Sequence, residues 1–279
     1  MSVRIVTDSG CEPGSLHWDT DVSIVPLVVT FGKVSFTEAE LCRERFWQLV
    51  VAQKKHPKSS QPSVGAFLEV FDPLVSAGHE VVCLTLTSKH SGTYNSASIA
   101  AREFGRGRVT IVDSLSASLG LGFQVELAAT MALKGSSVEG IVRAVEWMRE
   151  RVRVFAALDT MEYAERGGRA QRLMPVLKRV AGALKIKPLL NFVGGELRLA
   201  SIARTGKQVQ QRLLEELRKL GKLRRLGIMH TRLPDWAQTF ADRLADELDF
   251  PRELIVIAEA GLALSAQGGP GIMAFAAVV

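Results

Sequence analysis

The segment from Ser91 to Ala97 (SGTYNSA) has residue types that could bind an anion. It follows an apolar run, Val81 to Leu86, that is typical of a buried strand. The first N–H groups of a helix have no partner within the helix and lie at the positive end of its dipole, so small polar residues there can hold a negative charge. Gly92 allows close approach of the backbone, and the hydroxyls of Ser91 and Thr93 add donors. Ser91 or Thr93 could equally be a simple helix cap.

Two further segments have a similar polar character. Lys58 to Ser63 (KSSQPS) brings three hydroxyls and an amide ahead of a predicted helix, Val64 to Leu74, and Pro62 suits its N-terminus. Gln267 to Gly271 (QGGPG) predicts a tight turn before the apolar run Ile272 to Val279, because only glycine follows such a path without strain. Each segment is an ordinary loop by itself, and it is their combination and order that is informative.

In this order the three segments resemble the DegV family, bacterial fatty-acid-binding proteins that include the acyl-carrying subunits of fatty acid kinase. The resemblance covers nearly the whole chain, and the number of short matches in a fixed order makes it specific. The further matching segments are Ile5 to Ser9, Val25 to Leu27, Ile111 to Ser114, Leu158 to Tyr163, Arg166 to Arg169, Ile186 to Leu189 and Gly269 to Gly271.

The resemblance implies that a long-chain fatty acid lies between two α/β domains. In the family the carboxylate is held by the first residue of a TSQPS motif, the serine of SGT and a histidine two places before GPG. Carried over, these positions are Ser59, Ser91 and Gln267. Serine keeps the hydroxyl of threonine, whereas glutamine cannot carry the positive charge of a histidine. The predicted ligand-binding residues are Ser59, Ser91, Gly92, Thr93, Gln267 and Gly268.

The resemblance also implies a carrier with no catalytic residues of its own. A separate kinase would phosphorylate the bound carboxyl group to an acyl phosphate. Gly167 and Gly168 predict a tight turn that exposes Arg169, and more weakly Arg166, for docking to that kinase. The alternative is a structural arginine that holds the turn.

An enzyme is the main competing hypothesis. His90 precedes Ser91, but adjacent residues seldom align as base and nucleophile, and the GxSxG elbow is absent. The five histidines lack metal-binding spacing, and no GxxxxGK[ST] loop occurs. His230, at the end of a predicted strand, is the histidine expected nearest a cleft, although a structural role is favoured. Two alternatives stay open: a subunit or enzyme for a small hydroxylated or phosphorylated metabolite, similar to dihydroxyacetone kinases, and a basic adaptor with an empty cleft.

Length and composition bound the class of protein. A chain of 279 residues and 30.4 kDa predicts two domains, and 47% hydrophobic residues suffice for two cores. No window has the roughly eighteen uncharged apolar residues of a membrane helix, and the N-terminus starts with a strand rather than a leader. We therefore expect a cytoplasmic protein without stable membrane insertion. Three cysteines without CxxC spacing predict neither disulfides nor a zinc site, and no metal or cofactor is expected besides the fatty acid ligand.

The net charge of +6 invites comparison with nucleic-acid-binding proteins. Aromatic residues make up only 6% of the chain, and none is interleaved with the basic runs as base stacking requires. Charged helix faces explain such runs, so no nucleic-acid partner is predicted. An acidic protein partner is the remaining hypothesis. The basic clusters lie at 149–153, 166–172 and 218–225.

Alternating strands and helices predict an α/β fold of two domains. Residues 1–154 should form a three-layer α/β/α domain with a mainly parallel sheet, and residues 155–279 an α+β domain with a largely antiparallel or mixed sheet. The strands expected first are Val3 to Thr7, Val81 to Leu86 and Val109 to Val112, with helices Glu38 to Gln53, Val64 to Leu74, Ser96 to Phe104, Ala117 to Leu133 and Val138 to Arg151. The second domain should contain strands Phe155 to Thr160, Leu184 to Phe192, Glu196 to Ile202, Arg225 to His230, Glu253 to Ala258 and Ile272 to Val278, and helices Gly206 to Leu220 and Asp235 to Leu248.

Several single residues have two interpretations. Asp8 and Asp113 end predicted strands where α/β folds place ligands, but each could be a turn or N-cap residue. Gly120 and Gly122 lie in a helix that is apolar on nearly all sides, which predicts burial. Close helix packing explains these glycines most simply, and an acyl chain running past them is the alternative.

Overall fold

The first sheet is parallel and buried on both faces. Its strands are β1 (Val3–Asp8), β2 (Val22–Val25), β6 (Glu80–Thr85) and β7 (Val109–Asp113), in the order β2-β1-β6-β7. In β6, Val81 and Cys83 belong to a cluster with Phe67, whereas Val82 and Leu84 belong to the cluster on the opposite face. This two-sided burial explains the continuous apolar run of the strand. Residues 2–16, 18, 21–53, 56–169, 171–181 and 186–279 are described by the computed structural model.

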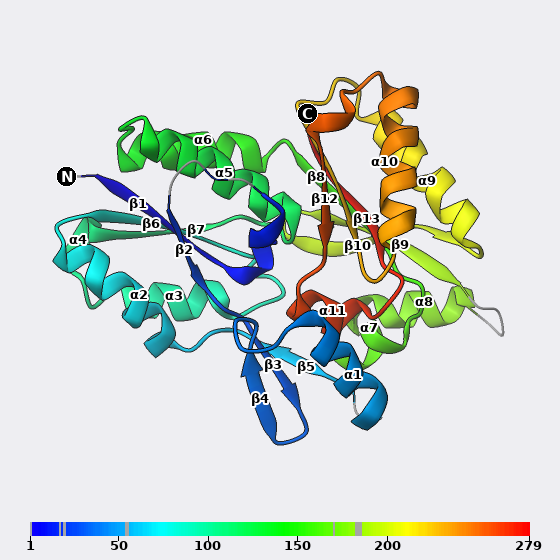
Figure 1. Cartoon of the computed structure of the whole chain (residues 1–279), viewed down its shortest axis with the longest axis horizontal. Coiled ribbons are helices and arrows are strands. Elements are labelled where there is room, and N and C mark those ends of the chain that lie inside the picture. The colour runs from blue at the N-terminus through cyan, green and yellow to red at the C-terminus, as the bar shows by residue number, and fades with distance from the viewer. Residues whose placement is uncertain (1, 17, 19–20, 54–55, 170, 182–185) are drawn as a thin grey trace.

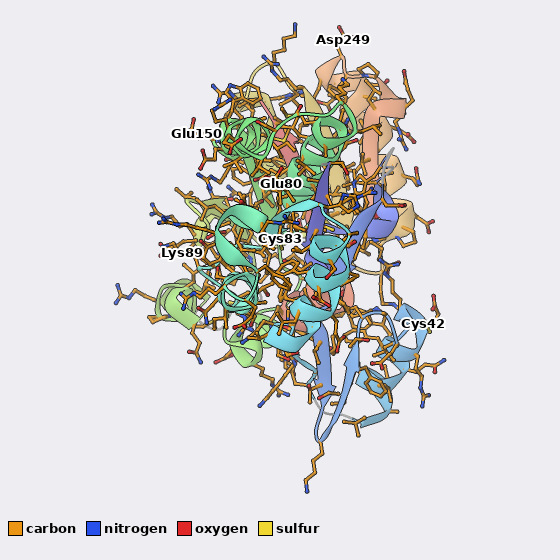
Figure 2. The ribbon with its side chains drawn as sticks, turned by 90° about the vertical axis from the view of Figure 1, so that its left-hand side faces the viewer. Cys42, Glu80, Cys83, Lys89, Glu150 and Asp249 are labelled. Carbon is orange, nitrogen blue, oxygen red and sulfur yellow. The ribbon has the colours of Figure 1, made fainter. Side chains whose placement is uncertain are left out.

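Helices cover both faces of this sheet, which confirms the predicted three layers (Figure 1). Helices α2 (Val64–Ser76) and α3 (Thr93–Ala101) lie on one side, and α5 (Leu119–Leu133) and α6 (Val138–Arg149) on the other. The interior position of Cys83 contrasts with the exposed Lys89 and Glu150 (Figure 2). Helix α3 begins one turn before the predicted Ser96, so Gly92 is its N-cap.

A small antiparallel sheet extends from this domain. It consists of β3 (Val28–Phe31), β4 (Val34–Thr37) and β5 (Lys58–Ser60), in the order β4-β3-β5, and α1 (Arg43–Gln53) follows β4. The predicted start of a helix at Glu38 is wrong, because α1 begins at Arg43. The Glu38 backbone N–H donates to the Leu27 carbonyl at 2.9 Å, and its carboxylate is used in a tertiary contact described below.

The second sheet has six strands and is mixed, as predicted. Its order is β10-β9-β8-β13-β11-β12, and only the β11–β12 pair is parallel. The strands are β8 (Val152–Ala157), β9 (Lys187–Val193), β10 (Glu196–Ala203), β11 (Arg225–His230), β12 (Ile255–Glu259) and β13 (Met273–Val278). Part of the strand expected from Leu184 lies outside the described residues. A domain boundary near residue 154 stays a prediction, and it falls within β8.

The helices of the second domain divide between a structural layer and the side that faces the first domain. Helices α9 (Gly206–Lys219) and α10 (Pro234–Leu248) pack on one face of the six-stranded sheet through a cluster that includes Leu213 and Phe240. The other short elements of this domain are α7 (Glu162–Gly167), α8 (Met174–Ala181), α11 (Leu262–Gly268) and the 3-10 turns η3 (Gln171–Leu173) and η4 (Arg252–Leu254). Those of the first domain are α4 (Gly105–Arg108), η1 (Ser9–Cys11) and η2 (Pro13–Ser15).

Two helices connect the domains. Helix α5 packs against β1 and β6 of the first sheet and against β8, β11 and β13 of the second. A Cβ atom on Gly120 would lie 2.6 Å from Val154, and one on Gly122 would lie 2.6 Å from the Cys11 carbonyl oxygen, so close packing accounts for both glycines. Helix α11 packs against β3, β5 and α7. It therefore carries residues of the second domain to the edge of the first.

Candidate functional site

Three residues predicted to hold a carboxylate lie around one cavity of about 110 Å³, which we call the polar cavity. Ser59 comes from β5, Ser91 from the loop before α3, and Gln267 from α11. Gln267 Nε2 donates a hydrogen bond to Ser59 Oγ at 2.8 Å. The packing of α11 on β5 thus brings together residues separated by most of the chain.

In the SGT segment, Thr93 holds Ser91 in place at the polar cavity. Ser91 Oγ lies 2.8 Å from Thr93 Oγ1 and accepts the Thr93 backbone N–H at 3.3 Å. Thr93 is completely buried, so it orients Ser91 rather than presenting its own hydroxyl. Gly92 has a different use: a Cβ atom there would lie 2.8 Å from Gln61 Nε2, so glycine lets Gln61 approach the start of α3.

A second cavity continues from the first and is almost entirely apolar. This apolar cavity of about 140 Å³ is lined by Ala156, Leu158, Leu190, Met229 and Ile272, together with Gly268. The two cavities share lining residues, namely Ala117, Arg169, Phe192, Leu197, Leu264 and Gln267. A polar compartment that opens into an apolar one suits a ligand with an anionic end and a hydrocarbon tail.

Gln267 lies at the junction of the two cavities. Among the residues that the structure describes, none donates a hydrogen bond to its buried Oε1. A Cβ atom on Gly167 would lie 2.2 Å from this oxygen, so the glycine makes room for the amide. Within the described residues, the amide therefore directs its donor at Ser59, and its buried acceptor has no donor.

The two arginines predicted to dock a partner have different surroundings. Arg169 lines both cavities, and one guanidinium nitrogen lies 3.5 Å from the Ser59 carbonyl oxygen. Its charge can therefore reach an anion in the polar cavity. Arg166 is exposed on α7 and forms an ion pair with Glu162 at 3.2 Å. Gly168 has a φ of 82°, which is the tight turn expected between the two arginines.

Two histidines accept backbone N–H groups through one ring nitrogen. His90 lines the polar cavity, and its Nε2 accepts the Leu197 backbone N–H at 2.9 Å. His230 is buried, and its Nδ1 accepts the Leu233 N–H at 3.1 Å, which is a structural role. Sequence reasoning did not identify Phe192 and Leu197 as cavity residues, because their role depends on how the second domain packs against the first.

The two strand-end aspartates are structural. Asp8 accepts the backbone N–H groups of Gly10 at 2.9 Å and Leu86 at 2.7 Å. Burial raises its pKa to about 7. Asp113 accepts the N–H of Leu115 at 2.9 Å. The interpretation of both residues as turn or cap residues is therefore confirmed.

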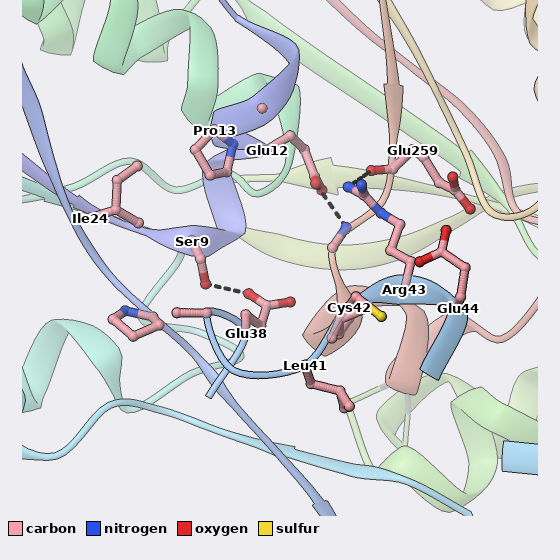
Figure 3. Close-up of a pocket in the computed structure, with 15 residues that line it drawn as sticks. Ser9, Glu12, Pro13, Ile24, Glu38, Leu41, Cys42, Arg43, Glu44 and Glu259 are labelled. Atoms are coloured by element: carbon pink, nitrogen blue, oxygen red, sulfur yellow. Dashed lines mark hydrogen bonds between the residues drawn. The ribbon is translucent and has the colours of Figure 1, made fainter. Parts of the chain in front are cut away.

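A larger pocket of about 620 Å³, the acidic pocket, lies at the N-terminal end of α11 (Figure 3). Glu12 accepts the Gly261 N–H and the Ser118 hydroxyl, each at 2.8 Å. Glu38 accepts the Ala263 N–H at 2.7 Å and the Ser9 hydroxyl. Both carboxylates therefore hold the start of α11 from the first domain.

The electrostatics of the acidic pocket follow from burial. Burial raises the pKa of Glu12 to about 8, and the nearby Glu38 charge adds to the increase. Burial also raises the pKa of Glu38. Arg43 lies at the same pocket and donates to the Glu259 carbonyl at 2.8 Å (Figure 3).

Three further features of the described part of the chain concern metal ligands, thiols and membrane-spanning helices. It contains no group of three or more His, Cys, Asp or Glu residues placed to hold a metal ion. Burial raises the pKa of Cys11 and Cys83 well above the ordinary range, which makes both thiols unreactive. No helix within the described ranges has the length and apolar character needed to span a membrane.

Comparisons with known proteins identify the family and the fold. The chain is 31% identical to a DegV domain-containing protein of Caldanaerobacter subterraneus, over 96% of this chain and 95% of that one. A fatty-acid-binding DegV family protein from Thermus thermophilus has a similar structure, with a TM-score of 0.88 and 29% identity over 100% and 99% of the two chains. The fatty acid kinase B3 protein of Streptococcus pneumoniae, whose structure contains linoleic acid, has the same fold, with a TM-score of 0.87 and 24% identity over both full chains. A model of the DegV family, described as uncharacterised proteins, matches residues 2–279, and the chain therefore belongs to the DegV family.

Proposed function

We propose that this protein binds a long-chain fatty acid between its two domains. The carboxylate lies in the polar cavity beside Ser59, Ser91 and Gln267, and the hydrocarbon chain enters the apolar cavity. The observation that supports this most directly is the shared boundary of the two cavities at Gln267 and Arg169. The fatty acid bound by the related Thermus thermophilus protein supports the same ligand class.

The hydrocarbon chain supplies most of the affinity. Burial of some fifteen methylenes at about 0.8 kcal/mol each contributes roughly 12 kcal/mol before costs. A hydrogen bond to a charged group contributes about 1.5–3 kcal/mol, and immobilisation of the ligand opposes both. The polar residues therefore set the position of the carboxylate and satisfy its hydrogen bonds, because an unpaired buried charge is strongly unfavourable.

Ligand entry requires the cavity walls to move. Each cavity is smaller than the roughly 300 Å³ at the lower end of typical ligand pockets. Flexible side chains such as Leu158, Leu264 and Met229 line the apolar cavity and can change rotamer to widen it. The wall formed by Phe192 and Leu197 is the other element that can move.

The protein acts as a carrier, and a separate kinase performs phosphoryl transfer. The His90 Nε2 accepts a backbone N–H rather than the Ser91 hydroxyl, so no base activates this serine through that nitrogen. The resemblance to acyl-carrying subunits of fatty acid kinase supports the partner. Arg166 and Arg169 are the proposed docking residues.

The ligand is tested by extraction of the purified protein with organic solvent, followed by mass spectrometry. A stoichiometric C14 to C20 fatty acid supports the proposal. A polar hydroxylated or phosphorylated metabolite in its place supports an activity similar to that of dihydroxyacetone kinases. If the extract contains no ligand and the protein does not bind added oleate, the proposal is contradicted. The remaining hypothesis is then the basic adaptor with an empty cleft.

The docking role is tested with Arg166→Glu and Arg169→Glu. Both variants should slow acyl-phosphate formation by the kinase, and the effect should grow as salt is lowered, because screening weakens. Arg166 is exposed, so Arg166→Glu should leave fatty acid affinity unchanged. Lys222→Glu, a charge reversal at an exposed residue in another basic cluster, is the matched control. Equal kinase rates for all three variants and the wild type would contradict docking at these arginines.

A further inference from the structure

The hairpin of β9 and β10 forms a wall of both cavities. Phe192 and Leu197 project from its two strands and line the polar and the apolar cavity. The strands are joined at Gly194 and Gly195, whose φ angles of 58° and 83° match a tight hairpin turn. Strand β10 is the edge strand of the six-stranded sheet. The position of this hairpin therefore decides how closed the proposed fatty acid site is.

Two side chains of the first domain attach to the hairpin. The Thr87 hydroxyl donates to the Gly195 carbonyl at 2.9 Å. The His90 Nε2 accepts the Leu197 backbone N–H at 2.9 Å, and its ring meets the Phe192 ring edge-on at a centroid distance of 6.2 Å. Leu197 and Phe192 face each other as the second pair from the turn. Such a pair directs its N–H groups away from the partner strand, so the Leu197 N–H points outward from the sheet edge toward His90.

The His90 contact depends on the protonation state of the ring. A neutral imidazole has one acceptor nitrogen, whereas an imidazolium has two donors and no acceptor. A protonated His90 cannot accept the Leu197 N–H and would place two N–H groups against each other. Among the described residues, three other charged groups line the outer pocket of about 430 Å³ that His90 and Leu197 share: Lys89 from the same loop, Arg169 from the turn after α7, and Glu196 from β10. Lys89 and Arg169 repel an imidazolium, and Glu196 attracts it.

We propose that His90 is a positioning residue that holds the β9–β10 hairpin over the lipid site while its ring is neutral and releases the hairpin when the ring is protonated. Fatty acid release is therefore faster in acid. This inference rests on the proposed function for its ligand. The hairpin attachment itself is independent of any ligand, because it consists of contacts between the two domains.

The test measures the release rate of cis-parinaric acid, a fluorescent C18 fatty acid, at pH 8 and pH 5.5. Histidine titrates between these values. The wild type should release the probe about fivefold faster at pH 5.5, which corresponds to the loss of one ordinary hydrogen bond. His90→Gln keeps an acceptor oxygen at both pH values, so its release should be slow and nearly independent of pH. His90→Leu has no acceptor and should release the probe rapidly at both.

His79→Gln is the matched control, because His79 is a partly exposed histidine of the first domain that bonds to Ser2 far from the cavities. It should retain the wild-type dependence on pH. Any small pH dependence that remains in His90→Gln reports titration of the probe's own carboxyl group and is subtracted from that of the wild type. An equal pH dependence in His90→Gln and the wild type would overturn the role of His90. A release rate of His90→Leu at pH 8 equal to that of the wild type would also overturn it.

Hydrogen exchange separates this inference from the proposed function. At pH 7.5 and without added ligand, the peptide that contains Leu197 should exchange several-fold faster in His90→Leu than in the wild type or in His90→Gln. Failure of the wild type to bind the probe at pH 8 would overturn the fatty acid function and the release mechanism together. Identical exchange in all three proteins would overturn the hairpin attachment alone.

Discussion

The acidic pocket borders the start of the short helix α11, and the polar and apolar cavities extend along the same helix to Gln267 near its other end. The acidic pocket is several times larger and contains Glu12 and Glu38. Both of their carboxylates are hydrogen-bonded to backbone or hydroxyl groups of the protein. At the other end, Gln267 has a buried oxygen without a donor among the described residues and opens onto an apolar surface.

The comparison teaches that pocket size is a poor guide to a ligand site. Carboxylates whose hydrogen bonds are satisfied internally have little to offer a ligand, and they position the backbone instead. A small cavity with polar groups at one end and hydrocarbon at the other has matching features for a fatty acid. The acidic pocket therefore positions α11, and the polar and apolar cavities are lined by Gln267 of that helix.

The largest effect is expected when the apolar cavity is filled. Ala156→Phe places a ring where we propose that the fatty acid tail lies, and displacement of three to four methylenes at about 0.8 kcal/mol each should weaken fatty acid binding about a hundredfold. Isothermal titration with oleate measures this loss. Ala156→Val should show a smaller loss, and Val51→Phe, on exposed α1, should show none. Unchanged oleate affinity in folded Ala156→Phe would show that the fatty acid tail does not occupy this cavity.

A smaller effect is expected at the head group. Ser91→Ala removes the proposed hydrogen bond to the ligand carboxylate, so oleate binding should weaken about tenfold and acyl-phosphate formation should fall sharply. The apolar cavity is unchanged, so lipid retention is not abolished. Ser98→Ala, on the helix α3 that follows Ser91, is the control, because within the described residues its hydroxyl has no hydrogen-bond partner. Full oleate affinity and a normal rate with the kinase in Ser91→Ala would contradict the anion site.

The acidic pocket is tested through the dependence of stability on pH. The folded protein keeps a proton on Glu12 up to a pKa of about 8, whereas the unfolded chain loses it near 4.5. This contribution to stability is complete below pH 4.5 and is lost as pH rises through 8, with a slope approaching about 1.4 kcal/mol per pH unit. In urea unfolding from pH 5 to 8, Glu12→Gln should therefore gain stability relative to the wild type as pH rises.

Glu44→Gln, at the exposed rim of the same pocket, is the control and should follow the wild-type curve. At pH 5, where Glu12 is neutral, Glu12→Gln should leave oleate affinity nearly unchanged. Unfolding curves that run parallel for Glu12→Gln and the wild type would show that Glu12 is ionised in the folded protein. A large loss of affinity would instead give the acidic pocket a direct role in binding.

The smallest expected effect concerns Gln267. An imidazolium donates a charge-assisted hydrogen bond about twice as strong as that of a neutral amide. Gln267→His should therefore tighten oleate binding about threefold to fivefold at pH 5.5 and leave it unchanged at pH 8. Oleate affinity is measured for His90→Gln and for the double variant His90→Gln with Gln267→His, because residue 90 does not titrate in either protein. Equal affinities of the two proteins at pH 5.5 would mean that another residue contacts the carboxylate.

Local patterns were enough to predict most regular elements. The apolar run of β6 and the amphipathic helices α6, α9 and α10 depend on burial and spacing within about fifteen residues, which a sequence displays directly. Helix α11 was not predicted, because a seven-residue helix has too few turns to show periodicity. The strands β3 to β5 were missed for the same reason, since each has only three or four residues.

The sequence by itself determined which residues could contact a carboxylate, because Ser59, Ser91 and Gln267 stand in short recognisable segments. Only the tertiary structure decided what these residues do. Packing of α11 on β5 places Gln267 against Ser59, burial turns Thr93 into a support, and the edge of β10 meets His90. Helix caps and strand patterns arise between neighbours in the chain. The cavities and their hydrogen bonds arise from two domains that meet, and no local pattern encodes the contact between residues more than a hundred positions apart.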